Sequence, residues 1–544
     1  MPPVTRSKGS PAKKEPEKKK EPEKKKEQKK KKPPLEYRDV AGSFLFRFPN
    51  GDEKQAQVAL FRRSGDVSTY QHMLAPISGS VEDGEISRPI GAALREIKEE
   101  TGLTMDSLEL LRVGKDYSFV DESVNRKWTI HPFAFRLLDK HEGGVGEEGI
   151  TLDWEHEGFE WFDPLDVDDS EEFGGVPNLV NSLRRVWPAY HLGPRAAQVL
   201  TSGTRDLRDD HDNGARVLAG KALVILKSVI VELDSEEIDI DSEWWVDVRM
   251  AAWHLCQARP SMGAAITSVI ITALNNLEEI FNQDRTRPEK IQQMIKAIDD
   301  QLEKRTHAIE RIRDAFVKYV RERVIRGRKN KKELSILTLS ASSTISSCLL
   351  QVAISLGVSL DLRILESRPL LEGVTLAATL LEAEDEHVDM RISIYTDAAV
   401  AVAVRGIDIL LLGADRISEN FEVYNKIGSV PATMCCRETE PGALIIILSE
   451  AEKIAPPGKI KDYPEEENGP KEVREGWPDQ VEGAKIIKNA SLQNRVRLRN
   501  TYFEWISNEN IDAYISDEGQ LMLDDITEKC KWIGSEMKRL FGEF

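Results

Sequence analysis

The chain has 544 residues, of which 40% are apolar and 31% are charged, and its formal net charge is −18. This length is too great for one hydrophobic core and predicts two or three domains. No apolar run approaches the roughly 18 to 20 residues of a membrane span. No apolar segment of a secretory signal is present, and the five cysteines form no CxxC pair. We therefore expect no membrane association and a reducing compartment, the cytoplasm.

Residues 1–34 are an N-terminal segment of Lys, Glu and Pro with repeated EPEKKK. Because this segment has almost no apolar side chain to bury, we expect a disordered tail. It carries 14 Lys and Arg against five Glu, so the rest of the chain is more acidic than the total suggests. Two interpretations of the tail stay open, a solvating segment and a basic patch for nuclear import or RNA contact. The acidic body makes a poor nucleic-acid binder unless the fold hides a basic groove.

Residues 35–190 show the mixed helix and strand pattern of an α+β domain. We expect a helix from Pro89, which suits a first helical turn, to Thr101, with Gly102 as its C-terminal cap. Strands are expected at 40–48, 57–62, 108–113, 128–136 and 159–162, where apolar residues alternate or cluster.

The expected helix carries three carboxylates in one place. Glu96, Glu99 and Glu100 stand at i, i+3 and i+4 and share one face. Such a face repels itself unless a cation is bound. Mg²⁺ prefers oxygen ligands from a few carboxylates and from a phosphorylated substrate. The run therefore predicts metal-assisted chemistry at a phosphate.

The segment from Gly79 to Leu103, GSVEDGEISRPIGAALREIKEETGL, resembles the Nudix box of the Nudix hydrolases. Its second half, from Arg95, matches every position of the family pattern REUxEExGU, in which U is aliphatic. Gly79 and Glu85 match the first half. Nine residues separate Glu85 from Arg95 where the family has seven. We expect the two extra residues in the loop at 87–89, which leaves the ligand helix intact.

The resemblance implies a Nudix fold that binds Mg²⁺ or Mn²⁺ and hydrolyses a nucleoside-diphosphate-type substrate. Glu96 and Arg95 are then the catalytic residues, with Arg95 orienting Glu96, and the implied metal ligands are Glu85, Glu96, Glu99 and Glu100. A later loop often adds one acidic residue in this family. The candidates, which the sequence does not rank, are Glu147, Glu148, Glu157 and Glu160. Arg62 and Arg63 are interpreted either as phosphate contacts or as surface residues at a strand end, and an inactive box is a further alternative.

Residues 195–330 have helical periodicity, at 215–233, 262–281 and 291–324, and predict a helical subdomain. From 331 to 544 strands and helices alternate, which predicts a Rossmann-like parallel sheet. The two longest apolar runs, 398–404 and 443–448, are interpreted as buried strands. The whole chain is thus expected to be a multidomain α/β protein.

Polar residues follow the strands of this sheet, and ligands of parallel sheets bind at the C-terminal strand ends. Hydroxyls before a helix suit a phosphate, as do Arg and Lys side chains, and a carboxylate suits sugar hydroxyls. The residues expected to bind a sugar phosphate on these grounds are Arg259, Ser342, Ser343, Thr344, Arg368, Asp415, Asn425, Lys426 and Lys453.

An ordered set of motifs spans residues 200–540. The motifs are DNGA at 212–215, ARPSM at 258–262, TLSASSTI at 338–345, ESRPLLEG at 366–373, TDAA at 396–399, GADRI at 413–417 and NKIGS at 425–429. The set resembles the translation initiation factor 2B regulatory subunits, whose superfamily includes methylthioribose-1-phosphate isomerase and ribose-1,5-bisphosphate isomerase. The resemblance adds Gly214 and Ala215 to the expected ligand site. It implies a sugar phosphate or nucleotide ligand, a homodimer or higher oligomer formed through this domain, and initiation-factor subunits as partners.

Two departures from that superfamily bear on function. Its isomerases pair a Cys in the TLSASST loop with the Asp of GADR. Asp415 is present, but Ser340 and its neighbours replace the Cys, and Cys348 is expected in the core of the next helix. The loop resembles that of alpha-type subunits, which bind sugar phosphates without turning them over. Phe421 replaces a Gly and is expected to narrow the pocket or alter ligand choice.

Three functional hypotheses follow. In the first, the chain is a Mg²⁺-dependent Nudix hydrolase whose C-terminal domain senses a sugar phosphate or nucleotide. In the second, it is a non-enzymatic regulatory protein like the translation initiation factor 2B alpha subunit. The third, a sugar-phosphate isomerase, is disfavoured by the missing Cys. The intact REIKEETGL favours the first, because a scaffold has no use for a carboxylate face.

Overall fold

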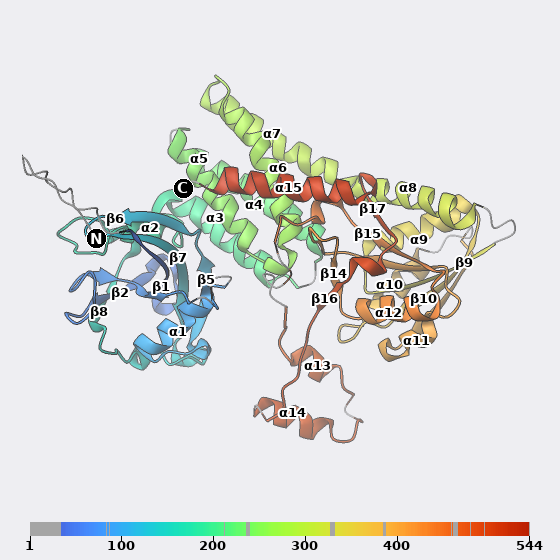
Figure 1. The fold of residues 1–544 in the computed structure, drawn as a ribbon, viewed down its shortest axis with the longest axis horizontal. Coiled ribbons are helices and arrows are strands. Elements are labelled where there is room, and N and C mark those ends of the chain that lie inside the picture. The colour runs from blue at the N-terminus through green and yellow to red at the C-terminus, as the bar shows by residue number, and fades with distance from the viewer. Residues whose placement is uncertain are drawn as a thin grey trace, which may run out of the picture.

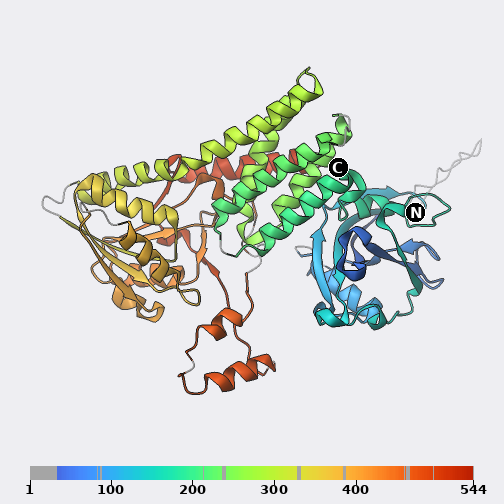
Figure 2. The same cartoon turned by 180° about the vertical axis from the view of Figure 1, so that it is seen from behind.

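The structure is a computed structural model, and three parts follow one another along its length (Figures 1 and 2). A sheet domain formed by the N-terminal part of the chain lies at one end, a layer of long helices lies in the middle, and a second sheet domain lies at the other end. The structure describes residues 34–82, 84–85, 88–211, 213–235, 240–326, 332–383, 388–458, 460, 466–478, 480–493 and 495–542. The expected disordered tail, apart from Pro34, and residue 87 of the loop at 87–89 where the insertion is expected lie outside these residues.

The N-terminal domain is a mixed sheet with a helix on each face. Its strands are β1 (Glu36–Arg47), β2 (Gln57–Arg63), β3 (Leu74–Ala75), β4 (Ile77–Ser80), β5 (Leu108–Val113), β6 (Tyr117–Asp121), β7 (Arg126–Leu137) and β8 (His156–Phe162). β1 and β7 pair in parallel at the centre, and the other pairings are antiparallel. Side chains alternate along β1: Leu45 packs with α1 (Ile90–Thr101) and Phe46 packs with α2 (Leu179–Arg184).

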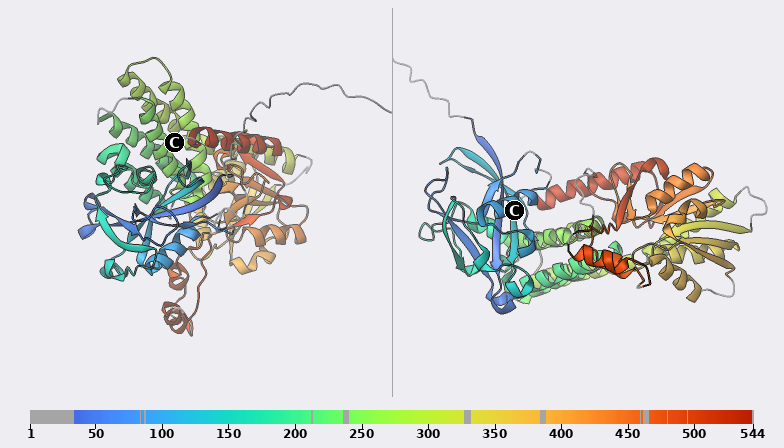
Figure 3. Two further views of the ribbon diagram at one scale, coloured as in Figure 1. Left: turned by 60° about the vertical axis from the view of Figure 1, so that its left-hand side comes forward. Right: turned by 90° about the horizontal axis from the view of Figure 1, so that it is seen from below.

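The middle layer is built from helices of two parts of the chain. These are α3 (Ala189–Asp209), α4 (Ala215–Ser235), α5 (Ser242–Gln257), α6 (Gly263–Phe281), α7 (Arg287–Thr306), α8 (Ala308–Val320) and the last helix, α15 (Leu523–Phe541). α15 returns from the second sheet domain and packs against α5 and α6, as Figures 1 and 3 show. The helical run expected at 291–324 is divided at His307, which ends α7 and precedes α8.

One segment of this layer qualifies as a membrane span by length and composition, although the sequence pattern predicted none. Residues Pro260–Phe281 pass this test, and 67% of their apolar window is buried inside the protein. α6 packs against α4, α5, α7 and α15, which is the environment of a core helix.

The second sheet domain has the expected alternation of strands and helices. Its strands are β9 (Glu333–Leu339), β10 (Ser359–Leu365), β11 (Met390–Tyr395), β12 (Ile409–Gly413), β15 (Leu444–Leu448), β17 (Ala513–Ser516) and β18 (Gly519–Leu521). The order is β11-β10-β9-β12-β15-β17-β18, and every pair is parallel except β17–β18. The helices of this domain include α9 (Ser343–Leu356), α10 (Glu372–Glu382) and α12 (Ser429–Thr439). The chain leaves β9 for β10 and later returns beside β9 as β12, so the order reverses between these two strands.

The strand predicted at 398–404 is wrong. A short helical turn, Asp397–Ala399, leads into α11 (Val400–Ala403). Val400, Ala403 and Val404 are the buried residues of this run, and that spacing is helical. The sequence AAVAVAV also suits a strand, which is why the pattern misled.

A small antiparallel sheet and a projecting arm were not predicted. The sheet consists of β13 (Arg416–Ile417), β14 (Val423–Lys426) and β16 (Phe503–Ile506). The arm carries α13 (Lys471–Glu475) and α14 (Ala484–Leu492) and extends away from the rest of the molecule in Figure 1.

Candidate functional site

α1 carries the predicted metal ligands in three different environments. Ala93 and Ile97 fix the helix against the sheet, and Gly102 ends it in the left-handed conformation at φ +71°. The side chain of Glu99 is 60% exposed, that of Glu96 is 14% exposed and that of Glu100 is 3% exposed. The three side chains are therefore progressively more buried, from Glu99 at the surface through Glu96 to Glu100 inside the domain.

Arg95 connects the remaining glutamates. Its guanidinium lies 3.0 Å from Glu85 Oε2, 2.6 Å from Glu96 Oε1 and 3.5 Å from Glu99 Oε2. It also donates to the carbonyl oxygen of Ser80 at 3.0 Å. The longer spacing between Glu85 and Arg95 has therefore not separated these two residues, and Arg95 orients three carboxylates together.

Gly79 lets Glu96 approach the sheet. A methyl group at this position would lie 1.9 Å from Glu96 Cδ. A side chain and the Glu96 carboxylate therefore cannot occupy the same space, which gives the glycine of the motif a steric role.

Glu100 pairs with His156, a residue that the sequence did not indicate. His156 Nε2 lies 2.5 Å from Glu100 Oε2, and both side chains are buried. Burial, followed by the charges of Glu155 and Glu96, raises the pKa of Glu100 to about 9. Burial lowers the pKa of His156, so the histidine is neutral. Glu100 Oε1 has no hydrogen-bond partner among the described residues.

These carboxylates fit a divalent cation. Burial and the nearby charges of Glu99 and Glu155 raise the pKa of Glu96, even though Arg95 opposes the shift. The charges of Glu96 and Glu155 raise the pKa of Glu100, and the charge of Glu155 raises that of Glu96, although no three of these carboxylates place oxygen atoms within 4.8 Å of one another among the described residues. A divalent cation removes this repulsion and gives Glu100 Oε1 a partner, and carboxylate oxygens are the ligands that Mg²⁺ and Mn²⁺ prefer.

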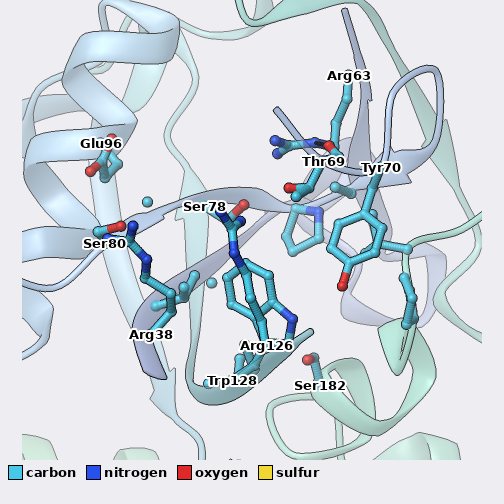
Figure 4. Close-up of a pocket in the computed structure, with 18 of the residues that line it drawn as sticks. Arg38, Arg63, Thr69, Tyr70, Ser78, Ser80, Glu96, Arg126, Trp128 and Ser182 are labelled. Carbon is cyan, nitrogen blue, oxygen red and sulfur yellow. Dashed lines mark hydrogen bonds between the residues drawn. The ribbon is translucent and has the colours of Figure 1, made fainter. Parts of the chain in front are cut away.

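A cavity of about 460 Å³ opens beside the carboxylates. Glu96 and Arg95 lie at one end, and Figure 4 shows the cavity continuing past Ser78 to Trp128 and Tyr70. Arg63 lines the cavity, because a β-bulge between Arg62 and Arg63 re-aims the second arginine. Arg62 instead pairs with Glu160 at the surface. Of the two interpretations, the phosphate contact suits Arg63 and the surface role suits Arg62.

The acidic residue that lines the cavity from a later part of the domain is Glu155, which was not among the sequence candidates. Those candidates pair elsewhere: Glu147 with Arg47, Glu148 with Lys140, Glu157 with His72 and Glu160 with Arg62. Glu155 precedes β8 by one residue, and only the pairing of β8 with β2 brings it to the cavity.

We expect the metal-free protein to lose stability as pH rises from 4.5 to about 9. The folded-state pKa of Glu100 is about 9 against an ordinary 4.5, so the native state binds more protons than the unfolded state across this window. Mg²⁺ should raise Tm most at the alkaline end of this range. Glu100 is already deprotonated there, so it binds the cation without first releasing a proton. Glu100→Gln should flatten both dependences in thermal unfolding measured across pH. A variant with the same pH profile as wild type would contradict this assignment.

The second cluster lies in the C-terminal sheet domain, where the strand order reverses. A cavity of about 180 Å³ is lined there by residues that follow β9 and β12 and by the N-terminus of α9. It brings together ten of the predicted residues: Gly214, Ala215, Arg259, Ser342, Ser343, Thr344, Asp415, Asn425, Lys426 and Lys453. Arg368 lies elsewhere and donates to the carbonyl oxygen of Gly476 at 3.2 Å, so it supports the base of the projecting arm.

Buried opposite charges organise this cavity. Lys453 Nζ lies 3.1 Å from Glu450 Oε2 and 2.7 Å from the carbonyl oxygen of Ala414. Burial raises the pKa of Asp415 despite the nearby Lys453 and Lys426. Burial would lower the pKa of Lys453, but Glu450 and Asp415 outweigh it and raise that pKa. The site thus holds mixed charges and exposed hydroxyls, which suit a phosphate attached to a polyol.

Several lining residues were missed by sequence reasoning. Lys426 pairs with Glu372 at 3.0 Å and lies 4.8 Å from the ring centre of Tyr502. Glu372 also accepts a hydrogen bond from Ser340 Oγ at 2.8 Å. Glu450, besides Lys453, accepts from Thr344 Oγ1 at 3.4 Å. Glu372 stands within the motif ESRPLLEG and Tyr502 within NTYFEW at 500–505, but neither was named as a ligand residue, and Glu450 lies in no motif.

The two noted departures have structural explanations. Cys348 is fully buried in the core, and burial raises the pKa of its thiol to about 12, as expected of a packing residue. Phe421 does not line the cavity, so the expectation that it narrows the pocket is wrong. Its φ is +66°, a conformation that favours glycine, and its side chain packs with the core beneath the small sheet.

Two domain classes account for these sites. A carboxylate helix on a mixed sheet, with an arginine that orients its glutamates, defines a Nudix domain, and the model of the NUDIX domain matches residues 40–183. The model of the initiation factor 2 subunit family matches residues 212–522, more than half of the chain. The protein therefore belongs to the initiation factor 2 subunit family and carries an N-terminal NUDIX domain.

Similar proteins have varied functions. The methylthioribose-1-phosphate isomerase of Geobacillus kaustophilus is 30% identical over 164 residues, which cover 30% of this chain and 42% of the enzyme. The ribose 1,5-bisphosphate isomerase of Archaeoglobus fulgidus is 24% identical over 246 residues, 44% of this chain and 72% of the enzyme. The chain thus spans less than half the length of the first relative.

Among solved structures, the translation initiation factor eIF-2B of Pyrococcus horikoshii shares 19% identity at a TM-score of 0.42. The match covers 59% of this chain and 96% of that chain.

Proposed function

We propose that this protein is a Mg²⁺-dependent hydrolase of a nucleoside-diphosphate-linked substrate, with a C-terminal domain that binds a sugar phosphate or nucleotide. One observation carries the hydrolase proposal. Arg95 holds Glu85, Glu96 and Glu99 together beside Glu100, whose buried Oε1 has no partner among the described residues.

The roles of the residues follow from their contacts. Glu96, Glu99 and Glu100 hold the cation, with Glu85 and Glu155 nearby. Arg95 keeps the Glu96 carboxylate aimed at the cavity, and His156 fixes Glu100 Oε2 so that Oε1 remains available. When bound, the cation supplies an activated water and neutralises charge on the phosphates. Arg63 binds the phosphate that is not attacked.

The ligand of the C-terminal domain is a smaller molecule than the substrate of the NUDIX domain. The second cavity is less than half the volume of the first. Hydroxyls and amide groups at the start of α9 suit the phosphate, and Asp415 suits the sugar hydroxyls. No cysteine lines this cavity among the described residues, so we propose binding without isomerisation. That feature also favours the second candidate function, a regulatory subunit that needs no hydrolysis. We further propose self-association through this domain, which native mass spectrometry of the full chain tests.

We expect ribose 5-phosphate to raise the Tm of the full chain, because a ligand that binds only the native state stabilises it. Asp415→Asn should reduce the shift, since a weaker acceptor faces the sugar. Arg368→Gln is the matched control and should respond as wild type does, because Arg368 lies outside the cavity. A shift of equal size in Asp415→Asn, or a lost shift in Arg368→Gln, would contradict the site. Turnover of a nucleoside-diphosphate panel with Mg²⁺ separates the hydrolase from the regulatory subunit.

A further inference from the structure

One face of the two central strands of the NUDIX sheet forms a wall of the cavity. The residues of this face that line the cavity are every second residue of each strand: Arg38, Val40 and Gly42 on β1 and Arg126, Trp128 and Ile130 on β7. Alternate residues of a strand point to the same face of a sheet. The parallel register places Arg126 beside Glu36, so Glu36 stands on this face too, two residues from Arg38 toward the start of β1.

Arg38 extends toward the metal ligands. Two residues after it, Val40 pairs with Ser80 on β4. Figure 4 shows the Arg38 side chain beside Ser80, on the side of the cavity where Glu96 lies. The carbonyl oxygen of Ser80 accepts a hydrogen bond from Arg95 at 3.0 Å, and Arg95 lies 2.6 Å from Glu96. A diphosphate that is attacked beside Glu96 therefore lies close to the Arg38 guanidinium as well.

The chain supplies its own anion to Arg38 and Arg126. Glu36 Oε2 lies 3.0 Å from Arg126 Nε, and Arg38 Nε donates to Glu36 Oε1 at 2.8 Å. Hydrogen bonds from Arg126 and then Arg38 hold the pKa of Glu36 below its ordinary value, so this carboxylate is charged at neutral pH. Two guanidinium groups that share one carboxylate also suit a phosphate, whose oxygens accept the same forks of donors.

This bridge is exchangeable. The side chains of Glu36 and Arg38 are 43% and 46% exposed, and ion pairs this exposed contribute little to stability. Arg126 is less exposed, at 21%, and its guanidinium carbon lies 5.4 Å from the ring centre of Trp128, so the ring holds it in place without Glu36. A diphosphate carries more charge and more acceptor oxygens than a carboxylate, and it therefore binds the same guanidinium groups more strongly.

We propose that Arg38 and Arg126 bind the diphosphate of the substrate, and that Glu36 is an internal competitor which the substrate displaces. This rests on the proposed hydrolase function. Figure 4 shows Arg63 on the opposite side of the cavity, so the diphosphate is held between Arg63 and this pair. Hydrolysis leaves two monophosphates, each with fewer contacts than the diphosphate. Glu36 then competes with them for the arginines and favours release of the products.

Binding of methylenediphosphonate, a diphosphate analogue that resists hydrolysis, tests the proposal by calorimetry on the full chain with Mg²⁺. Glu36→Gln should bind it about two- to fivefold more tightly than wild type, because an exposed carboxylate no longer competes. Arg38→Gln and Arg126→Gln should each bind it at least about tenfold more weakly, since each loses charged hydrogen bonds to the ligand. Glu36→Gln should bring no gain when both arginines are replaced by glutamine. A purely structural role of Glu36 would not produce tighter binding.

Glu160→Gln is the matched control, because Glu160 is an exposed glutamate of the same sheet that pairs with Arg62 outside the cavity. It should bind the analogue as wild type does. Equal affinity of wild type and Glu36→Gln, a gain that persists without both arginines, or no binding by any variant overturns the inference.

Turnover of nucleoside diphosphates separates this inference from the hydrolase function. Glu36→Gln should lower KM by the factor by which it tightens binding of the analogue. Tighter binding of the analogue without turnover of any nucleoside diphosphate supports the competitor and counts against the hydrolase. Turnover whose KM is the same in wild type and Glu36→Gln supports the hydrolase and overturns the competitor.

Discussion

Glu99→Gln is expected to lower kcat/KM for a nucleoside-diphosphate substrate by about a hundredfold or more, since removing even an indirect partner of a metal ligand costs about 10 to 100-fold. The substitution keeps the size of the side chain but removes one of the charges that hold the cation. The Glu99 side chain is 60% exposed and pairs with Arg95 at 3.5 Å, so the Tm of the metal-free protein should not fall. Steady-state kinetics with Mg²⁺, alongside Mn²⁺ affinity by electron paramagnetic resonance, measures both effects.

Glu148→Gln is the matched control for that experiment. Glu148 is an exposed glutamate of the same domain that pairs with Lys140, away from the cavity. It should retain wild-type turnover and Mn²⁺ affinity. Wild-type turnover by Glu99→Gln as well would remove the metal role of this residue, and equal losses in both variants would point to a general effect of surface charge.

Lys453→Met is expected to destabilise the C-terminal sheet domain by about 3 to 5 kcal/mol. Methionine fills a similar volume but leaves Glu450, whose side chain is 4% exposed, without its closest cation. Removing the charge also raises the pKa of Asp415 further, because Lys453 now lowers it. Protonation relieves both carboxylates, so the deficit should shrink as pH falls and grow as pH rises.

Hydrogen exchange at the amides of β12 and β15 measures this deficit locally, since a protein of several domains does not unfold in two states. The double variant Lys453→Met with Glu450→Gln should recover part of the loss, because it no longer buries an unpaired charge. Exchange rates in Lys453→Met equal to those of wild type would show that the pair contributes nothing to stability.

The sequence predicted best what depends on neighbouring residues. Glu96, Glu99, Glu100 and Arg95 fall within one helix, so their spacing alone places them together. The C-terminal ligand site was predictable for a different reason. Parallel strands end at one edge of a sheet, so residues after each strand meet there whatever the length of the chain between them.

What the sequence missed depends on pairing between distant strands. Glu155 and His156 reach α1 only because β8 pairs with β2. The sequence left Arg63 open between a phosphate contact and a surface role, because the bulge that turns it to the cavity belongs to the same pairing. Arg368 shows the converse: its motif placed it at the ligand, but its guanidinium lies at the base of the arm. Patterns of neighbouring residues do not reveal which distant strands pair. For α11, the alternation of Ala and Val alone did not distinguish a helix from a strand.

The position of α15 has a consequence for folding during synthesis. The strands and flanking helices of the NUDIX domain lie within residues 36–184, so all of them are synthesised early. The helical layer instead waits for residues 523–541, where Arg249 donates to the carbonyl oxygen of Leu540 and Trp253 meets the ring of Phe541. Until those residues leave the ribosome, the surface of α5 and α6 that α15 covers stays exposed to water. During this time the apolar surface of α5 and α6 must not associate with other partners, although the NUDIX domain is already complete.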